Sequence, residues 1–247
     1  MSERIAVVTG GAGSIGSAIA RRLSKLGYRV AIMDINLTGA ESLSRELPGS
    51  AVYAPCNVVE LDALREAFED IEKRLGPIEV VVNTAGGQRG LGIARKPYWE
   101  MPVAERNFIF NLNIYGILNT CHIVLPWMTE RRSGNIVNIS SGKGLKGGWG
   151  FAAYSAAKGA IVTFTQALAV EAGPFGVRVN SIAPGGVQSA WRGDEQAEER
   201  VQVDTKVPLQ RRTTPDDVAG AVAFLISEDA GHVTGACIDV SGGTSLH

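Results

Sequence analysis

The stretch Thr9-Gly10-Gly11-Ala12-Gly13-Ser14-Ile15-Gly16 directly follows the short apolar run Ile5-Ala6-Val7-Val8. After it, apolar residues recur every three or four positions as far as Leu26, which predicts an amphipathic helix. Three of the glycines satisfy the pattern G-x-G-x-x-G, namely Gly11, Gly13 and Gly16. Glycines let a backbone turn sharply and approach a pyrophosphate, whose charge the helix N-terminus favours. The stretch therefore predicts a strand–loop–helix unit that binds a nucleotide.

Outward from this loop, short strand-like runs alternate with helical patterns along the chain. Strands are expected over 28–33, 51–54, 80–83, 136–139, 177–182 and 238–240, and helices over 39–47, 60–75, 100–131, 152–172 and 215–228. This alternation predicts an α/β fold: a doubly wound, Rossmann-type parallel sheet of about seven strands with helices on both faces. Since no repeat, linker or low-complexity stretch interrupts the pattern, we expect residues 1–247 to form a single domain.

Composition narrows the class of protein. The 247 residues carry 24 Lys and Arg against 25 Asp and Glu, a net charge of −1, which gives no electrostatic case for nucleic acid or an anionic membrane as partner. The three cysteines are far apart without a C-x-x-C pair, so we expect neither a disulfide framework nor a metal site. Lacking a signal-peptide core or an unbroken 18-residue apolar run, the sequence predicts a soluble cytoplasmic protein.

Asp34 follows the expected strand over 28–33 and stands 18 residues after Gly16. A carboxylate at this place can accept hydrogen bonds from the ribose hydroxyls of an adenosine group. It would also repel the 2′-phosphate of NADP, and no Lys or Arg lies within Thr9–Ile19 or immediately after Asp34 to offset that repulsion. We therefore expect NAD as cofactor. The alternative is that Asp34 is an ordinary cap at the end of a strand.

Tyr154 and Lys158 stand four residues apart, hence on one face of the helix expected over 152–172. A phenol titrates near pH 10, too high for a base at neutral pH, but a neighbouring cation favours its ionised form. Ser141 follows the strand expected over 136–139, where its hydroxyl can donate a hydrogen bond to a substrate oxygen. These three residues after a glycine-loop unit indicate acid–base catalysis, although a Tyr and Lys at helical spacing are more often plain surface residues.

With these motifs, nearly the whole chain resembles the short-chain dehydrogenase/reductase family, in its branch of about 250 residues and most like 3-oxoacyl-ACP reductases. The resemblance implies catalytic roles for Asn113, Ser141, Tyr154 and Lys158. It implies that NAD contacts these residues: Gly10, Gly13, Ser14, Ile15, Gly16, Asp34, Asn57, Val58, Asn83, Ala85, Gly86, Tyr154, Lys158, Pro184, Gly185, Val187 and Ser189.

The chain departs from the family pattern at four positions. Ser14 replaces a glycine, Asn57 an Asp that commonly meets the adenine amino group, Thr84 an Asn, and Ser189 a Thr. The change at Ser14 bears most on cofactor affinity. Since each replacement is small or keeps a hydrogen-bonding group, the expected chemistry is retained.

The resemblance implies hydride transfer between the nicotinamide and a secondary alcohol or ketone. Tyr154 would act as general acid or base, Lys158 would hold the ribose and lower the pKa of Tyr154, Ser141 would polarise the substrate oxygen, and Asn113 would hold a water. The first alternative is a 3-oxoacyl-thioester (ACP or CoA) reductase that uses NADPH. The second is a nucleotide-binding sensor without turnover, although such a protein would be expected to have lost Ser141, Tyr154 or Lys158.

Substrate specificity is expected from three segments that bound the pocket in this family. They contain Arg89, Lys143, Trp149, Trp191 and Arg192. The tryptophans would form aromatic walls, and the cations would reach an anionic substrate group. Alternatively, these residues are a solvated, charged loop and the aromatics that pack it. The helices over 100–131 and 152–172 are apolar on more than one face, and in this family they form a dimer contact of a homotetramer.

Overall fold

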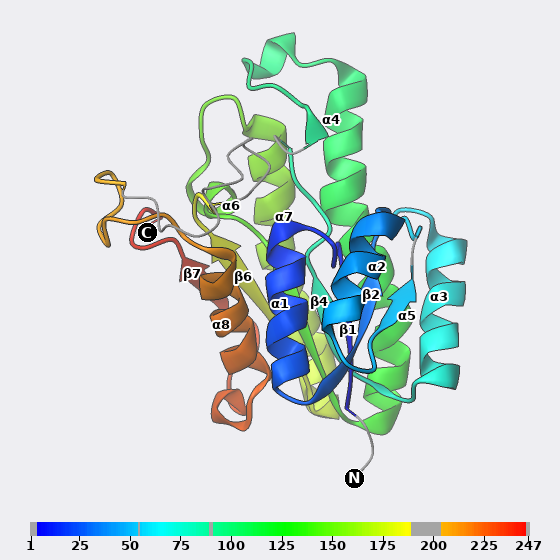
Figure 1. Ribbon diagram of the computed structural model, residues 1–247. Coiled ribbons are helices and arrows are strands. Elements are labelled where there is room, and N and C mark those ends of the chain that lie inside the picture. Colours follow the sequence, from blue (N-terminus) through cyan, green and yellow to red (C-terminus); the bar gives the residue numbers. More distant parts are fainter. Residues whose placement is uncertain (1–3, 54, 89–90, 189–203, 246–247) are drawn as a thin grey trace.

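The computed structural model describes residues 4–53, 55–88, 91–188 and 204–245, in which helices surround one central sheet (Figure 1). Seven strands form this sheet, in the order β3-β2-β1-β4-β5-β6-β7, and every neighbouring pair is parallel. They are β1 (Arg4–Thr9), β2 (Tyr28–Met33), β3 (Ala51–Tyr53), β4 (Ile78–Asn83), β5 (Gly134–Ile139), β6 (Val177–Pro184) and β7 (Cys237–Val240). The predicted doubly wound parallel sheet is confirmed. All described strands belong to it, which supports our proposal of a single domain.

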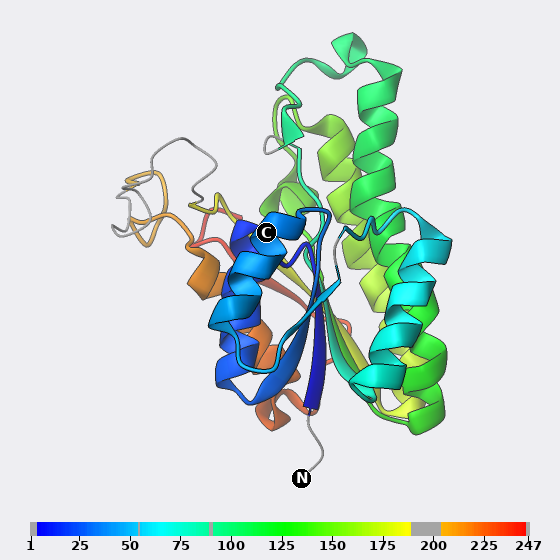
Figure 2. The ribbon, with the colours of Figure 1, turned by 45° about the vertical axis from the view of Figure 1, so that its right-hand side comes forward.

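The helices follow the strands in the expected alternation. They are α1 (Ser14–Lys25), α2 (Leu37–Glu46), α3 (Leu61–Arg74), α4 (Val103–Phe110), α5 (Gly116–Arg131), α6 (Gly142–Lys146), α7 (Ala152–Ala172) and α8 (Pro215–Ile226). Figures 1 and 2 show α1, α2 and α8 on one side of the sheet and α3, α5 and α7 on the other. The short helix α6 is absent from the sequence-based assignment because its glycines and lysines carry no apolar period.

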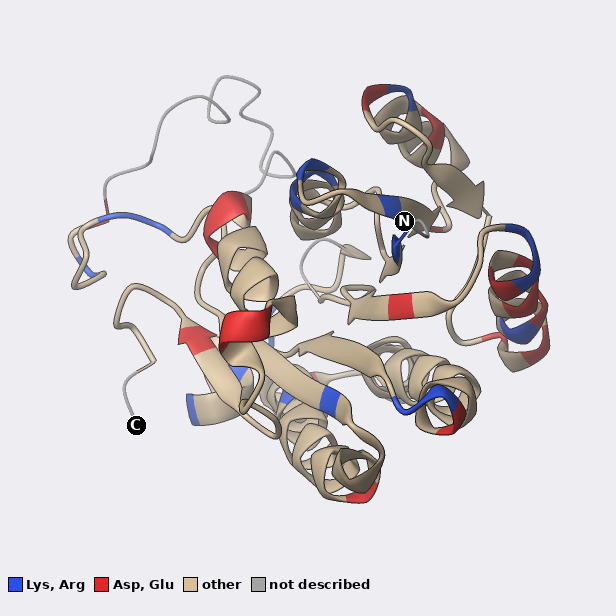
Figure 3. Cartoon of the chain, turned by 90° about the horizontal axis from the view of Figure 1, so that it is seen from below, with Lys and Arg blue, Asp and Glu red and all other residues tan. Residues whose placement is uncertain are grey.

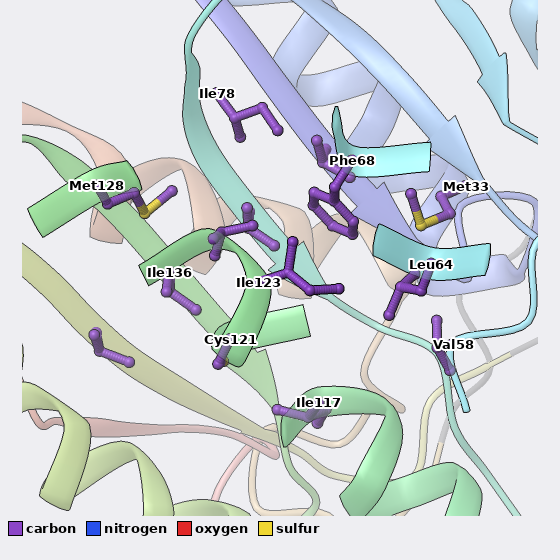
Figure 4. Close-up of a cluster of buried hydrophobic side chains, with 14 of the residues drawn as sticks. Met33, Val58, Leu64, Phe68, Ile78, Ile117, Cys121, Ile123, Met128 and Ile136 are labelled. Carbon is purple, nitrogen blue, oxygen red and sulfur yellow. The ribbon is translucent and has the colours of Figure 1, made fainter. Parts of the chain in front are cut away.

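Each face of the sheet has its own hydrophobic core. Ile5 and Val7 of β1 belong to the core beneath α3, α5 and α7, whereas Ala6 and Val8 belong to the core beneath α1, α2 and α8. This alternation follows from the two-residue side-chain period of a strand. Both sides of the central strands are covered, which explains why they consist of unbroken apolar runs. Figure 4 shows the first core, where Phe68 of α3 packs near Ile123 of α5.

The helix expected over 100–131 is divided in the structure. A 3₁₀ turn, η2 (Tyr98–Glu100), precedes α4, and a π-helical turn, η3 (Asn111–Tyr115), joins α4 to α5. A π-helical turn contains an extra residue compared with an α-helical turn. The periodicity of the sequence could not reveal it, because the apolar pattern continues through this turn. Val103–Arg131 is long and apolar enough to cross a membrane by composition, but core helices of soluble proteins pass the same test.

Charged residues lie mainly on the outer faces and ends of the helices. Seen from the end nearest the N-terminus, both signs of charge are present on these helices (Figure 3). The strands that form the interior are mostly uncharged in the same view. We therefore expect the polar side chains of a functional site at the carboxyl ends of the strands, where parallel α/β sheets bind their ligands.

Candidate active site

The glycine loop after β1 is packed so closely that two of its glycines admit no side chain. Gly10 has a φ of +63°, and a Cβ there would lie 2.8 Å from the backbone of Ala85. A Cβ on Gly16 would lie 2.2 Å from the carbonyl oxygen of Gly10. The loop thus folds back on the first turn of α1 and on the segment after β4. Ser14 begins α1 and Ile15 packs partly against the core, so neither departs from the expected loop geometry.

Asp34 stands at the end of β2 and binds the same loop. Its Oδ2 accepts the backbone N–H of Ala12 at 2.9 Å, and its Oδ1 accepts that of Asn36 at 2.8 Å. The expected alternative, a turn cap, is therefore part of its role. Since a carboxylate has about four acceptor positions, these two bonds leave capacity for ribose hydroxyls.

The turn after β4, Asn83–Gly86, contacts the glycine loop from the other side. The Thr84 hydroxyl donates to the carbonyl oxygens of Thr9 and Gly10, so this departure from the family pattern ties the two loops together. The side chain of Asn83 is buried and donates to Asn138 Oδ1 at 2.9 Å. The Nδ2 group of Asn83 therefore braces β4 against β5.

The predicted catalytic groups Ser141 and Tyr154 come together in space. Ser141 follows β5 and caps α6, where its hydroxyl accepts the backbone N–H of Lys143 at 3.2 Å. Tyr154 lies in the first turn of α7. Burial raises the pKa of Tyr154, and a hydrogen bond with Ser141 acts in the opposite direction.

Lys158 lies one turn after Tyr154 on α7 and is 3% exposed. Its Nζ donates to the carbonyl oxygen of Ile139 at 2.8 Å and lies 6.0 Å from the centre of the Tyr154 ring. Burial lowers the pKa of Lys158 to about 8. The sequence argument expected Lys158 to depress the pKa of Tyr154, but here the pKa of Tyr154 is raised. The physical reason is that burial penalises the charged form of both groups.

Asn113 lies in the π-helical turn and is fully buried. Its Oδ1 accepts the N–H of Gly87 at 2.8 Å, and its Nδ2 donates to the carbonyl oxygens of Gly87 and Ile109. A Cβ on Gly86 would lie 2.7 Å from Asn113 Oδ1 and 3.1 Å from Lys158 Nζ. Asn113 thus holds the Gly86–Gly87 backbone beside Lys158, and its binding of a water stays a prediction.

The remaining expected cofactor residues lie along the same edge of the sheet. Asn57 forms a turn in which its Oδ1 accepts the N–H of Val59 at 3.3 Å, and Val58 is buried against Gly116. Beyond β6, the N–H of Gly185 bonds to Val240 of β7, and Val187 pairs with Thr213. Ser189 lies outside the described residues.

Two of the five expected substrate residues belong to the described part of the chain. Lys143 is on α6, and Trp149 follows that helix with 72% of its surface exposed. Arg89, Trp191 and Arg192 lie outside the described residues. Sequence reasoning missed Arg95 and Phe151, whose guanidinium and ring stack at 4.6 Å within this region. No spacing rule could have paired two residues 56 positions apart.

The backbone at the N-terminus of α1 is suited to binding the phosphates of a dinucleotide. Helix α1 has glycine at its N-cap, no side-chain cap and no acidic residue in its first turn. The first amides of α1 are therefore free of side-chain competition for an anion, which the helix dipole also favours. The residues from Gly10 to Gly16, with Asp34, would hold the pyrophosphate and adenosine ribose of a nicotinamide dinucleotide. Ser141, Tyr154 and Lys158 lie at the carboxyl ends of β5 and on α7, suited to proton transfer.

Known proteins resemble this chain over almost its full length. A family model described as enoyl-(acyl carrier protein) reductase matches residues 10–245. Nodulation protein G of Azospirillum brasilense is 36% identical over 247 residues, covering 98% of each chain. Acetoacetyl-CoA reductase of Allochromatium vinosum is 36% identical over 252 residues, covering 99% of each chain.

Solved structures agree with these relatives. A 3-oxoacyl-[acyl-carrier protein] reductase of Brucella melitensis with bound NAD superposes with a TM-score of 0.86 at 33% sequence identity. The match covers 100% of this chain and 92% of that chain. The likeness therefore extends from the fold to the segments that carry the candidate site.

Proposed function

The chain belongs to the short-chain dehydrogenase/reductase family and is an oxidoreductase acting on CH–OH or keto groups, and we propose that it transfers a hydride between NAD(H) and a secondary alcohol or ketone. Membership confirms the resemblance that the sequence motifs indicated. A nicotinamide cofactor is a family property, whereas the choice of NAD over NADP belongs to the proposal.

The observation that carries the proposal is the convergence of Ser141, Tyr154 and Lys158. The phenol bonds to the Ser141 hydroxyl, and the lysine ammonium is anchored to Ile139 at 6.0 Å from the ring. Ser141 would orient the substrate oxygen and Tyr154 would exchange a proton with it. Lys158 would stabilise the phenolate and hold the nicotinamide ribose. When bound, the cofactor supplies the hydride donor or acceptor.

The proposed preference for NAD rests on Asp34. Two backbone N–H groups fix its carboxylate beside the glycine loop. A 2′-phosphate at this place would bring two negative charges together without a cation from Thr9–Ile19. The ribose hydroxyls of NAD instead offer donors to a carboxylate.

A second candidate is a 3-oxoacyl-thioester reductase that uses NADPH. The names of the acetoacetyl-CoA reductase and of the 3-oxoacyl-[acyl-carrier protein] reductase favour it. Both candidates use the same catalytic residues and differ in substrate and cofactor. A non-catalytic nucleotide sensor is the third candidate, and the presence of Ser141, Tyr154 and Lys158 speaks against it.

We also propose a homotetramer that works in the cytoplasm. Large apolar side chains are exposed on the helices that the sequence marked for contact between subunits: Phe108 at 48%, Tyr115 at 54% and Val170 at 78%. Covering them with a second copy removes apolar surface from water. Size-exclusion chromatography with light scattering should give four times the mass of the chain. A stable monomer would contradict the proposal.

The test is nicotinamide absorbance with NAD⁺ or NADP⁺ and a panel of secondary alcohols. The panel contains hydroxyacyl thioesters, cyclic alcohols, sugars and aryl ethanols. Turnover of a simple alcohol with NAD⁺ is the expected result. Turnover of hydroxyacyl thioesters alone with NADP⁺ supports the second candidate, and tight NADH binding without turnover of any member contradicts the substrate classes in the panel.

A further inference from the structure

Two cations lie over one aromatic ring at the substrate end of the site, and a third cation lies near one of them. The guanidinium of Arg95 lies 4.6 Å from the centre of the Phe151 ring, and Lys143 Nζ lies 5.9 Å from it. Lys146 is one turn after Lys143 on α6, and both Lys146 and Arg95 act electrostatically on Lys143. The cluster, called here the Arg95–Lys143–Lys146 cluster, joins residues from two separate segments.

The cluster adjoins the catalytic groups. The Phe151 ring lies 6.0 Å from the ring of Tyr154, centre to centre. Each cation lies within 6.0 Å of the centre of the Phe151 ring, so each lies within twice that distance of the centre of the Tyr154 ring. Lys143 also follows Ser141 by two residues, and its backbone N–H bonds to the Ser141 hydroxyl.

The backbone around the cluster holds two of the cations in place. A Cβ on Gly148 would lie 2.9 Å from Lys143 Nζ, and a Cβ on Gly150 would lie 2.7 Å from Arg95 Cβ. Both side chains therefore run close over glycine backbone. Stacking on Phe151 uses the face of the Arg95 guanidinium and leaves its N–H edges for an acceptor.

Within the described part of the chain, these three cations form no salt bridge with a carboxylate. Nearby Lys96, by contrast, pairs with Glu105 at 3.0 Å. Burial, Lys146 and Arg95 together lower the pKa of Lys143. The like charges are therefore close together, and no carboxylate among the described residues forms a salt bridge with them. An arrangement of this kind favours an anion in the space between the cations.

Gln88 provides an independent sign of a ligand beside the cluster. It is 3% exposed, and its Nε2 donates to the carbonyl oxygen of Gly150 at 3.1 Å. Its Oε1 is buried and has no hydrogen-bond partner among the described residues. A buried acceptor without a donor is costly, and a hydroxyl on a bound molecule would satisfy it.

We propose that the Arg95–Lys143–Lys146 cluster is an anion subsite that makes this enzyme select small alcohols or ketones bearing a carboxylate or phosphate. The inference rests on the proposed hydride transfer at Tyr154 and names the substrate class for it. The reacting carbon lies at Tyr154 and the anionic group lies at the cluster. The two ends of the substrate both lie close to one ring, because Phe151 adjoins both the cluster and Tyr154.

This short separation favours a small molecule over an acyl carrier thioester. In such a thioester the phosphate lies at the far end of a long pantetheine arm from the keto group. The cluster is next to the reacting position rather than at such a distance. A 3-oxoacyl thioester therefore serves as a discriminating arm of the test.

The experiment compares matched substrates with NADH as reductant. Short 3-oxo acids are paired with their methyl esters, and phosphorylated hydroxyketones with the free hydroxyketones, so that the two sources of anion are separated. Acetoacetyl-CoA is included. The variants are Arg95→Gln/Lys143→Gln, Lys143→Glu and the conservative Lys143→Arg. The control is Lys73→Gln/Arg74→Gln, which removes the same charge at the end of α3.

Wild type should show a higher kcat/KM for the anionic member of at least one kind of pair. The double Gln variant should lower that value by about tenfold to a hundredfold, because charge-assisted hydrogen bonds are lost. The neutral member should change by less than about threefold, and Lys143→Glu should also weaken the preference for the anionic member. Lys143→Arg should retain it, raised salt should weaken it, and the control should match wild type.

Several results would overturn the subsite. Equal kcat/KM for anionic and neutral members in wild type would do so, and so would an unchanged ratio in the double variant. Preference for acetoacetyl-CoA that survives both Gln substitutions would assign the pocket to thioesters instead. Failure of wild type to reduce any ketone while binding NADH overturns the proposed function, and the subsite with it. NADH affinity and thermal melting of each variant identify any loss of folding.

Discussion

The glycine loop and the catalytic cluster lie at the same edge of the sheet but are built in opposite ways. The loop is shaped largely by close backbone contacts, such as that of Gly16 with Gly10, six residues apart. The catalytic cluster joins Ser141 after β5 to Tyr154 and Lys158 on α7, and it works through burial and charge. Steric fit therefore governs the cofactor loop, whereas desolvation governs the catalytic cluster.

The largest effect of this difference is expected for Gly16→Ala. The added Cβ would lie 2.2 Å from a backbone oxygen that cannot move without reshaping the loop. Overpacking of this kind costs about 1–3 kcal/mol of unfolding free energy, and NADH affinity should fall more than tenfold. Chemical denaturation and fluorescence titration with NADH measure the two quantities.

The matched control for Gly16→Ala is Gly220→Ala in helix α8, where a Cβ would meet nothing within 4 Å. Removing a helical glycine there should stabilise the protein by roughly 0.5–1 kcal/mol. Equal effects at the two positions would show that crowding in the loop is not what requires glycine.

An effect on stability of similar size and opposite sign is expected for Lys158→Met. Burial lowers the pKa of Lys158 from 10.5 to about 8. Below pH 8 the full cost of burying its charge is present; between pH 8 and 10.5 the folded protein loses the proton first, so stability rises with pH. Removing the charge should raise the free energy of unfolding at pH 7 by about 1–3 kcal/mol. Loss of the hydrogen bond from Lys158 to Ile139 reduces this gain.

Urea denaturation at pH 7 and pH 10 measures the unfolding free energy of wild type and of Lys158→Met. Wild type should gain stability across that interval relative to Lys158→Met, while the variant loses turnover. The same pH dependence in both proteins would mean that Lys158 carries no desolvation cost, and the contrast between loop and cluster would fail.

The smallest effect is expected for Asp34→Asn. The amide oxygen can keep one of the two backbone hydrogen bonds but not the charge. The preference for NADH over NADPH should fall by about tenfold, since like-charge repulsion with the 2′-phosphate is removed. The ratio of dissociation constants gives the result, with exposed Asp62→Asn on α3 as control. An unchanged ratio would remove Asp34 from cofactor selection.

The contrast also explains what the sequence could and could not predict. Gly10, Gly16 and Asp34 were identified because a local turn needs glycine and a strand end places one carboxylate. The central strands were predicted because buried parallel strands are continuous apolar runs, and the partly buried end strands β3 and β7 still carry short apolar runs. The π-helical turn over Asn111–Tyr115 was missed, since one extra residue leaves the apolar pattern intact.

Properties that depend on packing stayed out of reach of the sequence. Spacing placed Tyr154 and Lys158 on one helix face, but it could not show that burial raises the pKa of one and lowers that of the other. It also could not find Arg95, which reaches Phe151 from a different loop. It also could not show that the side chain of Asn83 donates to Asn138, which follows from two neighbouring parallel strands ending side by side.

The most direct test of the proposed catalysis is Tyr154→Phe, measured by nicotinamide absorbance beside NADH titration. Loss of the phenolic proton donor should lower kcat by about 10²–10⁴-fold, with NADH affinity within threefold of wild type. Tyr53→Phe on the outermost strand β3, which three strands separate from β5, removes a hydroxyl bonded to Asp70 and should keep full activity. A Tyr154→Phe enzyme within tenfold of wild type would contradict the assignment of proton transfer to this residue.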